Sequence, residues 1–279
     1  MNNACKSLVA AFLVSTVSLS AAADSVKVTP LGSHDGEFCA MDRALIFEDP
    51  NGTRILYDAG RTVAGADDPR LGNIDVVLVS HVHGDHVGDR HIRDVNQGSC
   101  GGPEVPVVVL PESNSVNITA AKKAKIVTGS EMPAFFASKL KSVEGNPEDS
   151  LLVRFGAERV VGGVAITTVP AVHSNGLSPS FLTGPLAEYL KAAGASLGVL
   201  NIGDPYTTGP EEAAYVVNDL ITPNAVIASH ANEAATQDGM VRDGTRTKQF
   251  ISLSSMPVHV PLSGKTMSFD GTAHCTDGC

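Results

Sequence analysis

The chain has 279 residues, and 43% of them are hydrophobic, which excludes a disordered chain and predicts a globular protein with a sizeable core. Its formal net charge is −10 at pH 7. Because phosphate backbones bind Lys and Arg, this acidic balance argues against nucleic acid as the natural partner.

The first 23 residues have the features of a secretory signal peptide. Lys6 supplies a positive start, Leu8–Leu19 forms an apolar core, and Ala21-Ala22-Ala23 matches an A-x-A cleavage site. We therefore expect cleavage before Asp24 and a periplasmic or secreted protein. The apolar core is too short for a membrane span and no later segment is long enough, so no membrane span is expected. Residues 24–279 contain no linker or repeat and are predicted to form a single domain.

The mature chain begins with three predicted strands. Val26–Leu31 alternates between apolar and polar residues, as an edge strand does. Ala44–Phe47 and Arg54–Tyr57 are two further strands, and the Asn51-Gly52 pair between them predicts a hairpin turn. This hairpin leads directly to Asp58.

The next strand leads into the stretch that carries the chemistry. Ile74–Val79 is apolar and β-branched, which predicts a buried strand, and a His-x-His-x-Asp-His motif follows it: His81, His83, Asp85 and His86. Alternate residues at a strand end point the same way, so His81 and His83 can converge on one ion. The glycine after them turns the chain, which directs Asp85 and His86 towards a second ion. Imidazole nitrogens with one carboxylate suit zinc, and also iron or manganese.

Two more histidines follow predicted strands. Val164–Val169 leads to His173, and Val226–Ser229 leads to His230. The Gly162-Gly163 pair predicts a turn before the first of these strands, with Leu151–Phe155 on its other side. The remaining predicted elements of this region are the strands Val105–Leu110 and Ser196–Asn201, turn-and-helix material over 112–141 that includes a helix at Met132–Lys141, and helices at Pro185–Ala193, Gly209–Leu220 and Gly244–Ser255.

A hairpin is predicted to close the chain. It pairs Val258–Pro261 with Thr266–Phe269 over a Ser263-Gly264 turn, and it contains His259 as a structural residue.

Four cysteines lie beyond the signal segment: Cys39, Cys100, Cys275 and Cys279. An even number in an oxidising compartment predicts two disulfides. Three pairings are open, and the sequence does not choose among them. A Cys275–Cys279 bond would close a small terminal loop, whereas a bond from the tail to Cys39 or Cys100 would pin the C-terminus.

The His-x-His-x-Asp-His motif resembles the signature of the metallo-β-lactamase superfamily, and the likeness extends over most of the chain after residue 25. The resemblance implies an α+β fold, a four-layer αββα sandwich with a metal centre at one edge of its sheets, and hydrolysis by a metal-bound hydroxide. It also implies that His173 and His230 are metal ligands, and that Asp58 accepts a hydrogen bond from a ligand histidine. His34, in a loop, is a candidate proton donor on the substrate side.

The sequence departs from the superfamily's pattern at the aspartate that usually bridges two metal ions. That residue stands in a Gly-Asp-Thr-Gly turn, whereas the one Gly-Asp pair after His173 is Gly203-Asp204, followed by Pro205. Either Asp204 is the bridging ligand, or the hairpin that carries the bridge is absent near residues 193–195 and the second half of the fold is shortened. Without a bridge the implied ligands resemble those of the all-histidine subclass of secreted metallo-β-lactamases: His81, His83 and His173 for one ion, and Asp85, His86 and His230 for the other.

The sequence therefore predicts an exported metal-dependent hydrolase. Its expected cofactor is zinc, with two ions bound, and iron or manganese are the alternatives. The expected partner is a small-molecule substrate with an ester, lactone or amide carbonyl, and Asp85 is expected to orient the attacking hydroxide. The rival hypotheses are a β-lactamase and a metal-binding protein without catalysis. The sequence determines neither the particular substrate nor the oligomeric state.

Overall fold

The computed structural model describes residues 25–129, 132–169 and 194–279. The predicted signal segment, the predicted ligand His173 and the predicted helix Pro185–Ala193 lie outside these residues. Among the helices of the described ranges, none has the length and the apolar composition that a membrane crossing needs.

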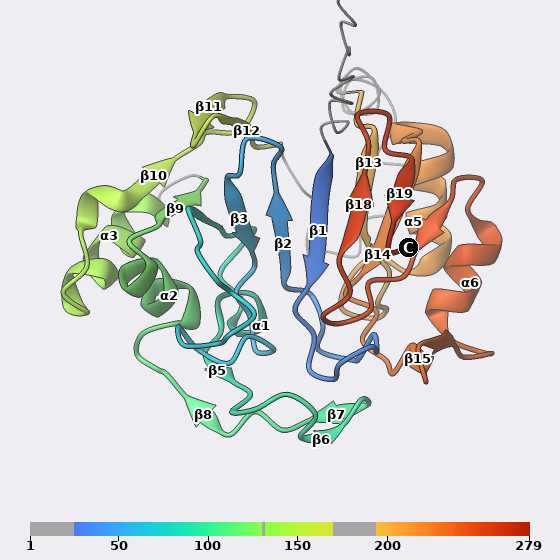
Figure 1. Ribbon diagram of the computed structural model, residues 1–279, viewed down its shortest axis with the longest axis horizontal. Helices are drawn as coiled ribbons and strands as arrows, with labels where there is room; N and C mark the ends of the chain where they lie inside the picture. Colours follow the sequence, from blue (N-terminus) through green and yellow to red (C-terminus); the bar gives the residue numbers. More distant parts are fainter. Residues whose placement is uncertain (1–24, 130–131, 170–193) are drawn as a thin grey trace, which may run out of the picture.

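A mixed sheet of eight strands forms the larger part of the fold (Figure 1). Its strand order is β10-β9-β4-β3-β2-β1-β18-β19. Four neighbouring strands, β3, β4, β9 and β10, run parallel to one another. β1 pairs antiparallel with β2, and β2 pairs antiparallel with β3. The strands are β1 Val26–Pro30, β2 Leu45–Glu48, β3 Arg54–Tyr57, β4 Val76–Leu78, β9 Lys125–Thr128, β10 Ser150–Leu152, β18 Met267–Phe269 and β19 Cys275–Asp277.

The hairpin predicted over Asn51-Gly52 is present between β2 and β3. The Gly52 amide donates to the Asp49 carbonyl at 2.8 Å, and Gly52 has a φ of +90°, where only glycine is unstrained. Since β3 and β4 are parallel neighbours, their carboxyl ends meet at one edge of the sheet. Asp58 and the histidine motif are thereby delivered to the same place.

A second, smaller sheet packs against the first. Its order is β13-β14-β17, all parallel, with β13 at Leu197–Asn201, β14 at Ala225–Ser229 and β17 at Val258–His259. Every residue of β14 is buried. Ile227 of β14 shares one apolar cluster with Val28, Leu45, Met267 and Phe269 of the larger sheet. The two sheets are therefore joined by a common core.

Helices cover the outer side of each sheet (Figure 1). α2 (Asn114–Lys122) and α3 (Met132–Ser142) pack on the larger sheet, with Ile118 and Phe136 in the same cluster as Ile126. α5 (Pro210–Tyr215), a π-helical turn over Val216–Ile221 and α6 (Arg246–Leu253) pack on the smaller sheet, where Phe250 meets Val226. The order helices, sheet, sheet, helices is the predicted four-layer αββα sandwich.

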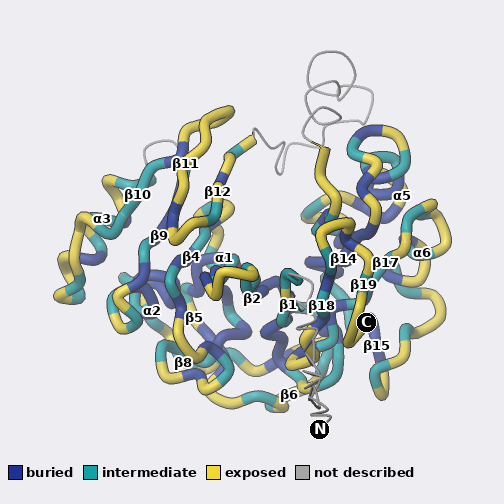
Figure 2. Tube along the Cα trace, turned by 45° about the horizontal axis from the view of Figure 1, so that its top comes forward, coloured by how far each residue is buried: buried dark blue, intermediate teal, exposed yellow. Residues whose placement is uncertain are grey.

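Short elements complete the fold. They are α1 Gly84–Val87, a 3-10 turn at Pro147–Asp149, and the strands β5 Arg90–His91, β6 Gly98–Ser99, β7 Gly102–Pro103, β8 Val107–Val108, β11 Glu158–Val161, β12 Val164–Thr167, β15 Thr236–Gln237 and β16 Met240–Val241. The β11–β12 hairpin is mostly exposed (Figure 2).

Several strands were missed by the sequence analysis: the two-residue strands β5, β6, β7, β15 and β16, the C-terminal strand β19, and the longer strands β9 and β11. Lys125–Thr128, within the stretch predicted to be turn and helix, is β9 and lies between β4 and β10. Glu158–Val161 is β11, and it is this strand that the Gly162-Gly163 turn joins to β12, whereas Leu151–Phe155 contributes β10 beside β9. The predicted strand Val105–Leu110 is reduced to β8. These pairings depend on neighbours far along the chain, which local periodicity does not reveal.

The predicted closing hairpin is wrong. β17 runs parallel to β14 in the smaller sheet, and β18 pairs with β1 and β19 in the larger one. The physical reason is that the two segments belong to different cores. Val258 packs on the cluster of Phe250, and Met267 packs on the cluster of Val28.

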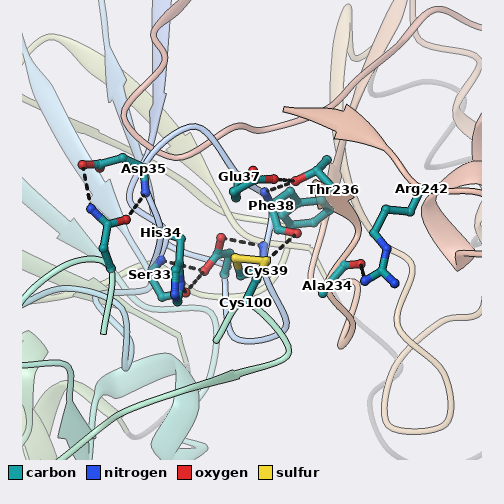
Figure 3. The surroundings of a disulfide bond; sticks show 12 residues. Ser33, His34, Asp35, Glu37, Phe38, Cys39, Cys100, Ala234, Thr236 and Arg242 are labelled. Carbon is teal, nitrogen blue, oxygen red and sulfur yellow. Dashed lines mark hydrogen bonds between the residues drawn. A yellow bond between two sulfur atoms is a disulfide. The ribbon is translucent and has the colours of Figure 1, made fainter. Parts of the chain in front are cut away.

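Of the three cysteine pairings, the structure has Cys39–Cys100 and Cys275–Cys279. Figure 3 shows the first of these bonds, which links the loop between β1 and β2 to the turn between β6 and β7. The Asp42 carboxylate accepts hydrogen bonds from the amides of Ser33 and Cys39, both at close to ordinary length (2.9 and 2.8 Å). The Cys39–Cys100 disulfide links this loop to a distant part of the chain, and the Asp42 carboxylate fixes its conformation from within.

Candidate metal centre

The histidine motif forms the loop after β4, and Asp58 anchors its start. Asp58 follows β3, is fully buried and has a φ of +47°. Its Oδ1 accepts from the Ser80 amide at 2.9 Å, and its Oδ2 accepts from the Ser80 hydroxyl at 2.7 Å. A Cβ added to Gly60 would lie 2.1 Å from the Asp85 carbonyl oxygen, so a glycine is needed where the two loops meet.

His86 is oriented by the same carboxylate. Its Nδ1 lies 2.6 Å from Asp58 Oδ2, and its ring is almost completely buried. A carboxylate only accepts hydrogen bonds, so the proton of a neutral His86 stands on Nδ1 and its Nε2 is free to bind a metal. The hydrogen bond that Asp58 is expected to accept therefore comes from His86 Nδ1.

The imidazole rings of the motif form one continuous cluster. The centroid of the His81 ring lies 4.6 Å from that of His83 and 4.0 Å from that of His86. The His86 ring stacks on that of His230 at 5.2 Å, although His230 is 144 positions further along the chain. β4 and β14 thus bring together four of the predicted ligand histidines from two different sheets.

Asp85 completes the centre. Its Oδ2 lies 3.6 Å from His86 Nε2 and 3.6 Å from His230 Nε2. One ligand atom from each of these three residues lies within 4.8 Å of the others. Two imidazole nitrogens and a carboxylate oxygen at this spacing are a donor set that fits zinc or another transition metal.

His230 reaches this position because two loops meet closely behind it. It follows β14 directly and has a φ of +51°. A Cβ on Gly203 would lie 2.0 Å from the His230 carbonyl oxygen, so only glycine permits the approach. The Asn232 side-chain amide donates to the Gly203 carbonyl at 2.7 Å, which joins the ends of β13 and β14.

A buried arginine lies behind the centre. Arg43, just before β2, places Nη2 3.1 Å from Asp85 Oδ2, 3.4 Å from His230 Nδ1 and 3.2 Å from Asn232 Oδ1. Burial would raise the pKa of the Asp85 carboxyl, but the contact with His230 and the nearby Arg43 and His86 hold that pKa well below its usual range. Burial lowers the pKa of His230. The centre thus holds an ionised carboxylate beside a neutral imidazole at neutral pH.

Comparison with known proteins agrees with this geometry. No protein-family model matches the chain. It is 27% identical over 212 residues to a UPF0173 metal-dependent hydrolase of Koribacter versatilis, covering 65% of this chain and 77% of that protein. Its fold is similar to that of Igni18, a metallo hydrolase of Ignicoccus hospitalis, with a TM-score of 0.57, 17% identity and coverage of 88% and 99% of the two chains. YhfI of Bacillus subtilis, a metallo-β-lactamase-fold protein, gives a TM-score of 0.51, 15% identity and coverage of 88% and 99%. The chain therefore has the metallo-β-lactamase fold.

The remaining ligands expected of a superfamily member are placed less fully. His173 lies outside the described residues. Asp204 is exposed in the turn after β13, and it is not part of the group formed by Asp85, His86 and His230. Its bridging role therefore stays a prediction, as does the absence of a hairpin near residues 193–195.

Two other histidines of the described residues lie away from this centre. His34 is in the loop between β1 and β2, where its Nδ1 lies 3.1 Å from the Ser33 hydroxyl (Figure 3). His259 stands near Cys275 and Cys279, whose sulfurs are joined to each other.

Arg43 and Asn232 were missed by the sequence analysis. The available signal was a charged residue directly before Ala44-Leu45-Ile46, three residues that are all buried. A cation at such a position needs a buried anion nearby, because an unpaired buried charge is strongly unfavourable. The sequence cannot indicate which of its 30 acidic residues supplies that anion.

Proposed function

We propose that this protein is an exported metal-dependent hydrolase of the metallo-β-lactamase superfamily that binds zinc and cleaves an ester, lactone or amide of a small molecule. The observation that carries the proposal is the convergence of Asp85, His86 and His230 within 4.8 Å, beside the rings of His81 and His83. The similarity to proteins named metal-dependent hydrolases supports it. A divalent ion bound there lowers the pKa of a water molecule towards neutrality and polarises a carbonyl.

The residues of the chain have separate tasks in this proposal. Asp58 fixes the ring of His86 through Nδ1 and so presents Nε2 to the ion. Asp85 binds the ion and orients the attacking water. His81, His83 and His173 are the proposed ligands of a second ion.

Export is supported by the four paired cysteines, since disulfides persist in oxidising compartments. If it is correct, the mature protein from a periplasmic or culture fraction begins at Asp24, which N-terminal sequencing reads directly. A protein that retains its first 23 residues would contradict export.

The hydrolase proposal is tested by removing and restoring zinc. The chelator-treated chain should be inactive on a panel of chromogenic esters, lactones, open-chain amides and a β-lactam, and zinc should restore turnover on at least one class other than the β-lactam. His86→Ala should reduce that turnover by more than about a hundredfold, because losing a ligand costs more than losing its hydrogen-bond partner. His274→Ala, which replaces an exposed histidine away from the centre, is the matched control and should leave turnover unchanged.

Three results would decide against the proposal. Equal turnover with and without zinc would contradict metal dependence. Zinc binding without turnover on any substrate would favour the alternative of a metal-binding protein without catalysis. Turnover of the β-lactam alone would make the chain a β-lactamase.

A further inference from the structure

Arg43 is the most deeply buried cation near the metal centre. Its side chain is 5% exposed, so it does not reach solvent or a substrate. It is also fixed in place: Nη1 donates to the Met41 carbonyl at 2.9 Å, and Nη2 donates to Asn232 Oδ1. The residue before it, Asp42, is held by two backbone amides of the loop that the Cys39–Cys100 bond anchors.

The guanidinium already neutralises the carboxylate that the Asp85–His86–His230 set would offer to an ion. The oxygen concerned is Asp85 Oδ2, which faces Arg43 Nη2 at 3.1 Å and both histidine Nε2 atoms at 3.6 Å. A divalent ion bound to this oxygen therefore shares it with a fixed positive charge. In a buried environment the repulsion between the two cations is only weakly screened.

Arg43 also contacts His230, through the ring nitrogen Nδ1, which is not the nitrogen that faces Asp85. A guanidinium has donors only, so at 3.4 Å from Nη2 the His230 Nδ1 must be the acceptor. The proton of neutral His230 then stands on Nε2, the nitrogen that faces Asp85 and would have to bind the ion. His86 has the reverse arrangement, because the Asp58 carboxylate keeps its proton on Nδ1. The two histidines of the set are thus unequally prepared as ligands.

We propose that Arg43 weakens the Asp85–His86–His230 set for divalent cations, so that the chain takes up zinc in two unequal steps and this set fills in the weaker one. Arg43 is a positioning residue here, since it keeps Asp85 and His230 in place before the ion arrives and its charge sets the affinity. This inference rests on the proposed metal-dependent function.

The experiment titrates zinc into the chelator-treated full chain by isothermal calorimetry. The wild-type chain should show two binding events of different affinity, and His230→Ala should remove the weaker one. Arg43→Met keeps the aliphatic stem and removes the charge and the donors. Because the repulsion between the guanidinium and the ion is removed, it should strengthen the weaker event by on the order of tenfold or more and leave the tighter event unchanged.

Two further variants separate charge from fold. Arg43→Lys retains the positive charge and should leave the weaker event weak. Lys27→Met removes the same charge from an exposed ion pair with Glu48 and should change neither event. Arg43→Gln, which is neutral and polar, gives the same test as Arg43→Met if the apolar side chain prevents folding.

The outcomes are distinct. Two wild-type events of equal affinity, or a weaker event that Arg43→Met leaves unchanged or weakens further, would overturn the inference and leave the proposed function intact. No zinc binding by the folded wild-type chain would overturn the proposed function, and this inference with it.

Discussion

Two aspartates with different partners shape the histidine cluster. Asp58 is buried among donors, the Ser80 amide and hydroxyl and His86 Nδ1, and it presents no oxygen to an ion. Asp85 lies between two histidine Nε2 atoms and a guanidinium, and it is a quarter exposed. Their environments therefore give one carboxylate an orienting task and the other a ligand task.

The orienting task of Asp58 can be measured apart from catalysis. Asp58→Ala removes the acceptor for His86 Nδ1 and frees the ring to turn, so zinc affinity should fall by about ten- to a hundredfold. Asp58→Asn keeps one acceptor oxygen and should lose less. Calorimetric zinc titration reads both values.

The control for Asp58 is Asp49→Ala, in the turn at the other end of the β2–β3 hairpin, which should leave zinc affinity unchanged. Wild-type zinc affinity in Asp58→Ala would show that the hydrogen bond does not prepare the ligand.

Elements built from local signals could be predicted from the sequence. β3 has its predicted bounds, and β4 lies within its predicted segment, because a short apolar run after a turn carries its own pattern. The hydrogen bond of Asp58 to a ligand histidine was expected from the superfamily resemblance, and the structure identifies that histidine as His86. β9 was not predicted, and β17 and β18 were predicted as strands but with the wrong partners. β9 is defined by two parallel neighbours, and β18 pairs with β1 from the opposite end of the chain. Arg43 was missed for the same reason, because its anion comes from another strand end.

The two disulfides constrain elements over very different lengths of chain. Cys39–Cys100 links residues 61 positions apart, whereas Cys275–Cys279 spans 4. Loop-closure entropy predicts that removing the longer link costs about 4 kcal/mol of the free energy of unfolding, against about 2 kcal/mol for the shorter one. Urea unfolding of Cys39→Ala/Cys100→Ala and of Cys275→Ala/Cys279→Ala compares them directly. A larger loss in the second variant would show that the entropic argument does not hold here.

At the scale of the whole molecule, two sheets bring residues from both halves of the chain to one edge. The fold aligns with 99% of Igni18 at 17% identity, so the scaffold is kept with few shared side chains. The two sheets also meet at His259, whose ring in β17 contacts the Phe269 ring of β18 at 5.2 Å. Because His259 is half-buried at this junction, we expect the packing of the two sheets to depend on pH.

Burial, and then the neighbouring His274, lowers the pKa of His259. A histidine whose pKa is lowered by folding takes up its proton more readily in the unfolded chain, so its contribution to stability falls as the pH drops below about 6.5. His230 acts with the same sign. The carboxylates with lowered pKa, such as Asp85, keep their contribution until the pH falls below about 4.

The free energy of unfolding of the metal-free chain should therefore decrease between about pH 7.5 and about pH 5.5. His259→Gln should make that decrease shallower, and His274→Gln, which removes the smaller cause, should change it less. Parallel profiles for wild type and His259→Gln in urea unfolding would show that the junction does not sense protons.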